Sequence, residues 1–217
     1  IRDRLSGRNL ELITIGGFPR DEEVQEVAKF SSSRGVKTIV TGPSNAHARD
    51  IWHHGYTEKS LEEETRRLSD MGKKCRDYDI DLCIHLEGKA IQSIDRLLES
   101  TDPEYVNLCL DTGWMMAGLR DPITVIMRYV DRIKHVHLKD WRKTLVNVGL
   151  DAPLLGEFCE LGTGQIDHPK IFKTLRDAGY DGWYVVETPV YHNRDVGRAP
   201  SPEESAKINL KYLKKVL

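Results

Sequence analysis

Short apolar runs recur along this chain at intervals of about 25 residues, and this spacing limits the fold more than any other feature. Most runs have the length and β-branched character of a buried strand and are followed by a segment with helical periodicity. We expect strands to begin near residues 10, 36, 80, 105, 133, 158 and 183. Such alternation is typical of a parallel sheet whose strands are connected by helices, either doubly wound or closed into a barrel.

Charged residues at the carboxyl ends of the runs favour the barrel. Four of the runs are followed directly by Glu87, Asp111, Lys139 or Glu187. Barrel enzymes build their active sites at this end of the strands, so the pattern indicates an α/β fold of the (β/α)8 TIM-barrel type. Seven strands are recognisable where a complete barrel has eight. We therefore predict a single domain over residues 1–217 that lacks the first barrel strand in this chain.

Helical periodicity and capping signals define the connecting segments. Asp121 and Pro122 form an N-cap followed by proline at the first helical position, and Ser201 and Glu204 have capping-box spacing. The stretch 45–56 is predicted to be a long polar loop. Helices are expected at about 21–34, 57–78, 90–99, 121–130, 167–178 and 201–217.

Composition narrows the possible partners and compartments. The 217 residues carry a formal net charge of −2, which does not indicate nucleic-acid binding, and no apolar run approaches the ~18 residues that span a membrane. The four cysteines lack CxxC spacing, so a zinc knuckle is not expected. Cys83 and Cys109 lie in apolar runs and are predicted to be buried free thiols, which favours a reducing cytoplasm. The sequence leaves homo-oligomerisation open.

The run RIKHVHLKDWR at 132–142 carries the densest group of reactive side chains. Side chains of a strand alternate between its faces, so His135, His137 and Lys139 share one face. Three polar groups in such a row are costly to bury without partners, and histidine is the commonest metal ligand. The alternative is that His135 is a satisfied core histidine and that Lys139 reaches solvent.

The same alternation brings further candidate ligands to this rim. On the run at 80, His85 and Glu87 share a face with Asp81 and Cys83; on the next run, Asp111 shares a face with Asn107 and Cys109. With His137 and Glu187, these groups suit one divalent ion of the Mn²⁺, Mg²⁺, Co²⁺ or Zn²⁺ kind. Asp111 could instead cap the following helix, and Glu187 could instead pair with Lys139 or Arg142.

Four motifs together resemble the sugar phosphate isomerase/epimerase superfamily, which has the xylose isomerase-like barrel. They are DTG at 111–113, HVHLKDW at 135–141, ELGTGQID at 160–167 and AGYDGWYVVE at 178–187. The resemblance covers about residues 36–217 and is nearest to the inosose dehydratase-like branch. In that superfamily one metal is held by a Glu after the fourth barrel strand, an Asp after the fifth, a His after the sixth and a Glu after the eighth.

The resemblance implies a ligand set in this chain. Asp111, His137 and Glu187 match the family pattern directly, and at the fourth strand we favour Glu87 as the ligand with His85 as its neighbour. Trp114 departs from the pattern, because many members have a His after the DTG motif. A tryptophan cannot titrate, so the detailed chemistry at that position is expected to differ.

The implied activity is isomerisation or epimerisation of a keto-sugar or keto-polyol through a metal-stabilised enediolate. Inosose dehydratase-like elimination of water is the alternative reaction. Glu87 and Glu187 are the acid/base candidates, and Lys139 could stabilise the enolate or carry a proton. Substrate contacts are predicted for His85, Trp114, Trp141 and Arg142, although the two tryptophans could equally be wall packing.

Two alternative functions of other classes are also considered. AP endonuclease barrels share this architecture, but their three-metal cluster needs more rim histidines than this chain offers. A non-catalytic sugar-binding barrel is compatible with Trp114 and with the absent first strand. The pair Gly162 and Gly164 could face a phosphate or simply form a tight turn, and no phosphate is predicted from it.

Overall fold

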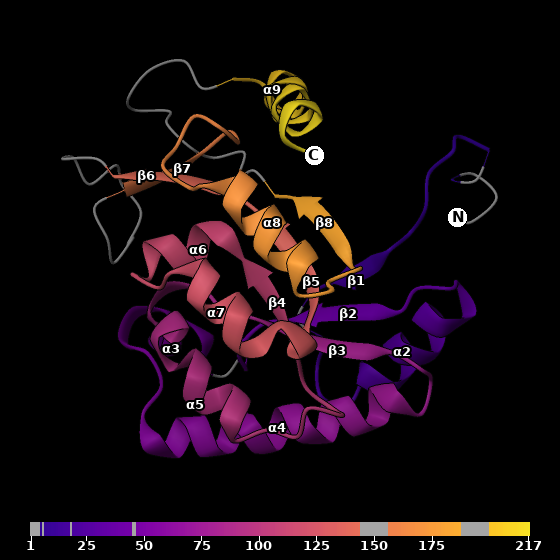
Figure 1. The fold of residues 1–217 in the computed structure, drawn as a ribbon. Coiled ribbons are helices and arrows are strands. Elements are labelled where there is room, and N and C mark those ends of the chain that lie inside the picture. The colour runs from indigo at the N-terminus through magenta and orange to yellow at the C-terminus, as the bar shows by residue number, and fades with distance from the viewer. Residues whose placement is uncertain (1–4, 6, 18, 45–46, 144–155, 188–199) are drawn as a thin grey trace.

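A curved parallel sheet covered by helices forms the body of the protein (Figure 1). The computed structural model describes residues 5, 7–17, 19–44, 47–143, 156–187 and 200–217. Six strands pair in the order β1-β2-β3-β4-β5-β8, and all neighbours are parallel. They are β1 (Thr14–Gly16), β2 (Thr38–Thr41), β3 (Asp81–His85), β4 (Asn107–Asp111), β5 (Ile133–Leu138) and β8 (Trp183–Val186). The predicted barrel architecture is confirmed, since the six strands form part of the wall of a (β/α)8 barrel.

The strand expected near residue 158 does not join this wall, and the prediction of seven parallel strands is wrong at that place. After β5 the chain continues at Lys139 into β6 (Asp140–Lys143), which pairs antiparallel with β7 (Gly156–Cys159). The backbone groups of β7 are therefore met by β6, and β5 pairs directly with β8. The ring of Trp141 fills the space over Gly156, where a Cβ atom would lie 2.1 Å from it.

The helices follow the predicted order, with α3 and α6 as additional α-helices. The stretch 45–56, expected to be a loop, contains helix α3, because Ile51 inserts into the core at 3% exposure and Trp52 packs against Gly88. The helical segments are α2 (Val24–Ser33), α3 (Ala48–His54), α4 (Glu58–Arg76), η1 (Gly88–Ser93), α5 (Ile94–Glu99), α6 (Thr112–Ala117), α7 (Pro122–Tyr129), η2 (Val130–Arg132), α8 (His168–Asp177) and α9 (Pro202–Val216). The predicted caps at Asp121 and Ser201 are confirmed.

The alternation of side chains along the central strands puts the hydrophobic core on one face of the sheet and the reactive side chains on the other. One face of the central strands carries fully buried aliphatic side chains that belong to the main hydrophobic core: Leu82, Ile84, Leu108, Leu110, Val136 and Leu138. Burying such side chains contributes about 1.5–3 kcal/mol each relative to leaving them exposed. The opposite face carries the cysteines, histidines and carboxylates predicted for the barrel interior. All four cysteines are buried free thiols, as Cys83 and Cys109 were predicted to be.

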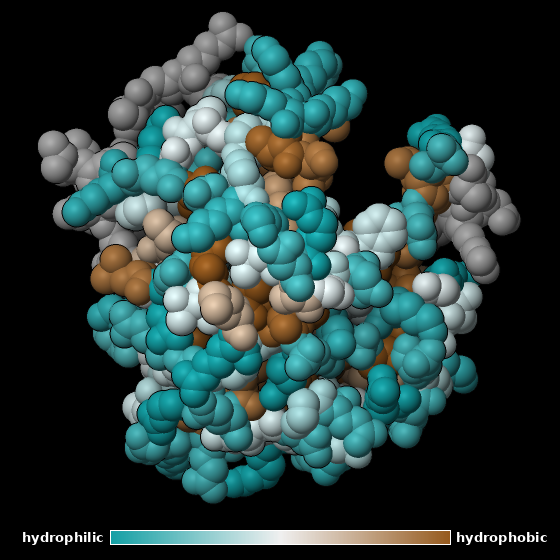
Figure 2. Space-filling view, viewed as in Figure 1, coloured by the Kyte–Doolittle hydropathy of each residue, from teal (hydrophilic) through white to brown (hydrophobic). Residues whose placement is uncertain are grey.

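The sheet has two edges, β1 and β8, in the part of the chain that the structure describes. Trp183, on the edge strand β8, is 49% exposed. In the space-filling view a notch separates the N-terminal segment from the region of α9 (Figure 2). Among the described residues, no helix is both long and apolar enough to cross a bilayer.

Candidate active site

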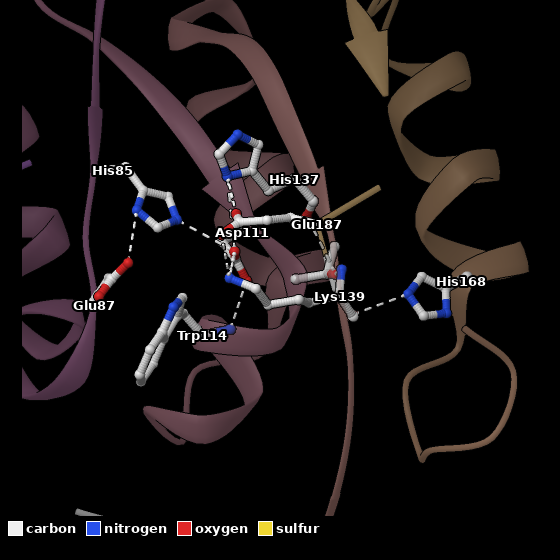
Figure 3. Close-up of polar contacts among 9 residues, drawn as sticks. His85, Glu87, Asp111, Trp114, His137, Lys139, His168 and Glu187 are labelled. Carbon is white, nitrogen blue, oxygen red and sulfur yellow. Dashed lines mark hydrogen bonds and ion pairs between the residues drawn. The ribbon is translucent and has the colours of Figure 1, made fainter. Parts of the chain in front are cut away.

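Four side chains from neighbouring strands converge at the carboxyl edge of the sheet (Figure 3). His85 ends β3, Asp111 ends β4, His137 lies on β5 and Glu187 follows β8. Each offers a nitrogen or oxygen atom, and these atoms all lie within 4.8 Å of one another. Strand register accounts for this, since Asp111 is paired with His137 and the backbone N–H of Glu187 donates to Leu138 at 3.1 Å.

Asp111 uses its two carboxylate oxygens for different purposes. Oδ1 accepts a hydrogen bond of 2.8 Å from the backbone of Trp114 and so caps α6. Oδ2 lies 3.3 Å from His85 Nε2 and 3.0 Å from Lys139 Nζ. Burial raises the pKa of Asp111, but the Lys139 charge and the contact with His85 outweigh burial and hold this pKa below its usual range. Helix capping through Oδ1 and metal binding through Oδ2 are therefore compatible roles for Asp111.

Lys139 lies between the two carboxylates of the site rather than in solvent. Its side chain is 3% exposed, and Nζ lies 3.0 Å from Asp111 Oδ2 and 3.1 Å from Glu187 Oε1. Burial lowers the pKa of Lys139, but the two negative charges more than compensate and raise it above its usual value. The lysine is thus a fixed positive charge. Thr112 Oγ1 donates to the Lys139 carbonyl at 2.6 Å and accepts from its N–H at 3.0 Å, which anchors the backbone.

His137 and Glu187 present atoms that fit a cation. His137 Nδ1 lies 2.6 Å from Glu187 Oε2, yet both atoms are buried without a hydrogen bond of normal geometry. An imidazole nitrogen and a carboxylate oxygen are a suitable pair of ligands for a divalent ion. Burial raises the pKa of Glu187, but the contact with His137 and the charge of Lys139 lower it to about 2, so this carboxylate is ionised.

His85 separates Glu87 from the other three side chains of the group. Its Nε2 faces Asp111, and its Nδ1 lies 3.4 Å from Glu87 Oε1 (Figure 3). Burial lowers the pKa of His85, but the neighbouring Asp111 and Glu87 raise it more. The structure therefore places His85 in the four-residue group, while Glu87, the ligand favoured from the sequence, lies behind it with a side chain that is 37% exposed.

Only one of the aromatic residues predicted to touch substrate borders this group. The ring centroid of Trp114 lies 5.9 Å from Lys139 Nζ. Trp114 also makes edge contacts with Trp52 at 6.0 Å and Phe158 at 4.8 Å, two residues that the sequence did not single out for the site. The sequence marks these two residues only as aromatic, because their positions beside Trp114 depend on the placement of α3 and β7.

Trp141 and Arg142, which were predicted to contact substrate, instead contact other residues of the protein. Trp141 is 8% exposed and belongs to the hydrophobic core. Arg142 forms an ion pair with Glu157 across the β6–β7 pair. The structure thus gives both residues packing or pairing roles in the hairpin.

The glycine loop after β7 surrounds an internal carboxylate. Asp140 Oδ2 accepts hydrogen bonds from Gly162 at 2.9 Å and Gly164 at 3.0 Å, and Oδ1 accepts from Trp141 at 2.8 Å and Ile166 at 3.1 Å. A Cβ atom on Gly164 would lie 2.2 Å from Asp140 Oδ1, so only glycine permits this approach. These loop amides therefore bind a side chain of the same chain.

Comparison with known proteins agrees with this architecture. A family model described as the xylose isomerase-like TIM barrel matches residues 9–216. The chain belongs to the xylose isomerase-like TIM barrel family. A solved family structure from Mycobacterium smegmatis, in complex with magnesium, superimposes with a TM-score of 0.71 at 16% identity, covering 99% of this chain and 76% of that one. At this identity the likeness concerns the fold alone.

Two named relatives are similar to the chain in sequence. The chain is 32% identical over 214 residues to inosose dehydratase of Bacillus cereus strain AH820, covering 86% of this chain and 72% of that protein. It is 36% identical over 169 residues to inosose dehydratase of Clostridium tetani, covering 73% of this chain but only 55% of that relative's length. The chain thus spans little more than half the length of the Clostridium tetani protein.

Proposed function

We propose that this chain carries the active site of a divalent-metal-dependent enzyme that abstracts the proton next to the carbonyl of a keto-polyol and then eliminates water. The sequence motifs place isomerisation or epimerisation first, whereas the inosose dehydratase relatives favour dehydration. Both reactions begin with the same proton abstraction to an enediolate. The single observation that carries the proposal is the convergence of His85, Asp111, His137 and Glu187 at one rim, beside the buried Lys139.

The residues that would hold the ion are His85, Asp111, His137 and Glu187. Two carboxylates and two imidazoles suit Mn²⁺, Co²⁺ or Zn²⁺ and also permit Mg²⁺. When bound, the ion would polarise the substrate carbonyl and the adjacent hydroxyl. Glu87 then orients the ring of His85 through Nδ1, in the manner of a carboxylate that supports a ligating histidine. This assignment replaces Glu87 by His85 in the ligand set predicted from the sequence.

Lys139 is assigned the role of stabilising the negative charge that develops on the substrate oxygen. Its raised pKa keeps it protonated, so it acts as a fixed cationic donor and not as a base. A buried, preoriented positive charge stabilises an oxyanion without reorganising during the reaction. Trp114, whose ring lies beside Lys139, is assigned to contact with the apolar face of the substrate ring.

Two carboxylates in different surroundings divide the proton transfers. Glu187 is held between His137 and Lys139 and is assigned as the base that takes the carbon-bound proton. Glu87 lies 3.4 Å from the ring of His85, away from Lys139, and is assigned as the acid that protonates the departing β-hydroxyl. The C–O bond at the β-carbon then breaks, water leaves, and the enol of a diketone remains. Paired carboxylates in contrasting environments commonly separate such roles.

Deuterium exchange tests the proposal. The metal-loaded chain is incubated in D₂O with keto-inositols and with ketoses, and deuterium at the carbon next to the carbonyl is followed by NMR together with loss of water. We expect metal-dependent exchange on a keto-inositol, lost in His137→Ala, and retained in Glu104→Gln, which changes an exposed carboxylate.

Glu187→Gln separates the roles of this residue when its metal content is measured. Retained metal without exchange assigns Glu187 as the base, and retained metal with full exchange moves the base to Glu87. Exchange without loss of water supports the isomerase reaction. A metal-loaded parent chain that exchanges no substrate in the panel would refute the enzymatic proposal in favour of a sugar-binding barrel.

A further inference from the structure

A second group of potential ligands lies one layer deeper in the barrel than the rim site. Cys109 and His135 are paired in the register of β4 and β5, two residues before the pair Asp111 and His137. The sulfur of Cys109 and one ring nitrogen each of His135 and His137 lie within 4.8 Å of one another. The proposed reaction uses neither Cys109 nor His135.

His135 is the observation that marks this group as more than core packing. The residue is 0% exposed, and neither Nδ1 nor Nε2 has a hydrogen-bond partner among the residues that the structure describes. Buried polar groups are almost always paired, and an unpaired one costs about 1–3 kcal/mol. The satisfied core histidine considered from the sequence does not describe this environment.

We propose that Cys109, His135 and His137 form a second metal site, selective for a borderline or soft divalent cation of the Zn²⁺ class. One thiolate and two imidazoles are ligands that Zn²⁺, Co²⁺ and Cd²⁺ prefer and that Mg²⁺ does not. Coordination deprotonates the thiol, and its proton leaves to solvent. The rim site, with its two carboxylates, also accepts hard ions, so the two sites differ in selectivity.

The two sites share His137 but can be separated by mutation. The His137 side chain is 15% exposed and belongs to both the deeper group and the rim group. Asp111→Asn removes a rim ligand only, whereas Cys109→Ser removes a deep ligand only. This inference goes beyond the proposed reaction, and its failure would leave deuterium exchange by the rim site unaffected.

Cobalt titration of the 217-residue chain tests the deeper site, because a Co²⁺–thiolate bond gives a charge-transfer absorption in the near ultraviolet. We expect this absorption in the parent chain and in Asp111→Asn. The absorption should disappear in Cys109→Ser. In His135→Gln the apparent affinity for Co²⁺ should fall at least tenfold. Cys83→Ser is the matched control, since Cys83 is equally buried and packs beside Cys109 but lies outside the ligand group.

A second measurement keeps the test decisive if a core variant fails to fold. X-ray absorption of the zinc-loaded parent chain should show a sulfur neighbour at about 2.3 Å. A folded parent chain that binds Co²⁺ and Zn²⁺ with neither a thiolate absorption nor a sulfur neighbour would overturn the proposal. So would an absorption that persists in folded Cys109→Ser or disappears in Cys83→Ser.

Discussion

Lys139 and a bound divalent ion compete for the same two carboxylates, so removing the lysine charge should tighten metal binding. A ligand bond from Asp111 Oδ2 would be about 2.1 Å long, and Lys139 Nζ lies 3.0 Å from that oxygen. The ion and the ammonium group would therefore be at most about 5 Å apart. At that separation a double and a single positive charge repel by about 7 kcal/mol at an effective dielectric constant of about 20.

The two carboxylates between the cations offset much of this repulsion, so we expect a fraction of it to appear as affinity. Lys139→Met should bind Mn²⁺ ten- to a hundredfold more tightly, which corresponds to about 1.4–2.8 kcal/mol. In the metal-free state the same variant should be less stable by about 3–5 kcal/mol, because Asp111 and Glu187 lose their buried counter-ion.

Calorimetric titration with Mn²⁺ and urea unfolding of the metal-free protein measure the two effects. Lys134→Met is the control, since Lys134 lies on the same strand but is exposed. It should change neither quantity appreciably. Unchanged or weaker Mn²⁺ binding by folded Lys139→Met would refute the competition and place the ion away from Asp111.

Three further predictions concern the surroundings of the site. Glu87→Gln should weaken metal binding less than His85→Ala in a metal titration, and the reverse ranking would return Glu87 to the ligand set. Asp140→Asn should lower the free energy of unfolding by about 2–4 kcal/mol in urea, because the charged acceptor of four backbone amides is lost, whereas Asp131→Asn on the surface should have little effect. The lowered pKa of Glu187 stabilises the metal-free fold above the usual carboxylate pKa, and this contribution is lost as the pH falls from about 5 towards 2. Unfolding of Glu187→Gln should therefore depend less on pH over that range, and an identical pH dependence in the parent and the variant would contradict the assignment.

The sequence alone determined the features that depend on local periodicity. The two-residue alternation of a strand put His135, His137 and Lys139 on one interior face, and the strand spacing indicated the barrel. Helix signals were equally local, as the caps at Asp121 and Ser201 show. These predictions hold because each depends on residues that are a few positions apart in the chain.

Only the tertiary structure decided which atoms meet. Alternation put His85 and Glu87 on the same face, but the position of His85 beside Asp111 depends on the packing of β3 against β4. The burial of Lys139 between two carboxylates likewise joins residues on different strands. The antiparallel partner of β7 and the carboxylate inside the glycine loop were also beyond local signals. Such contacts depend on the free energy of pairing and desolvating groups that are distant in sequence, which no pattern within one segment records.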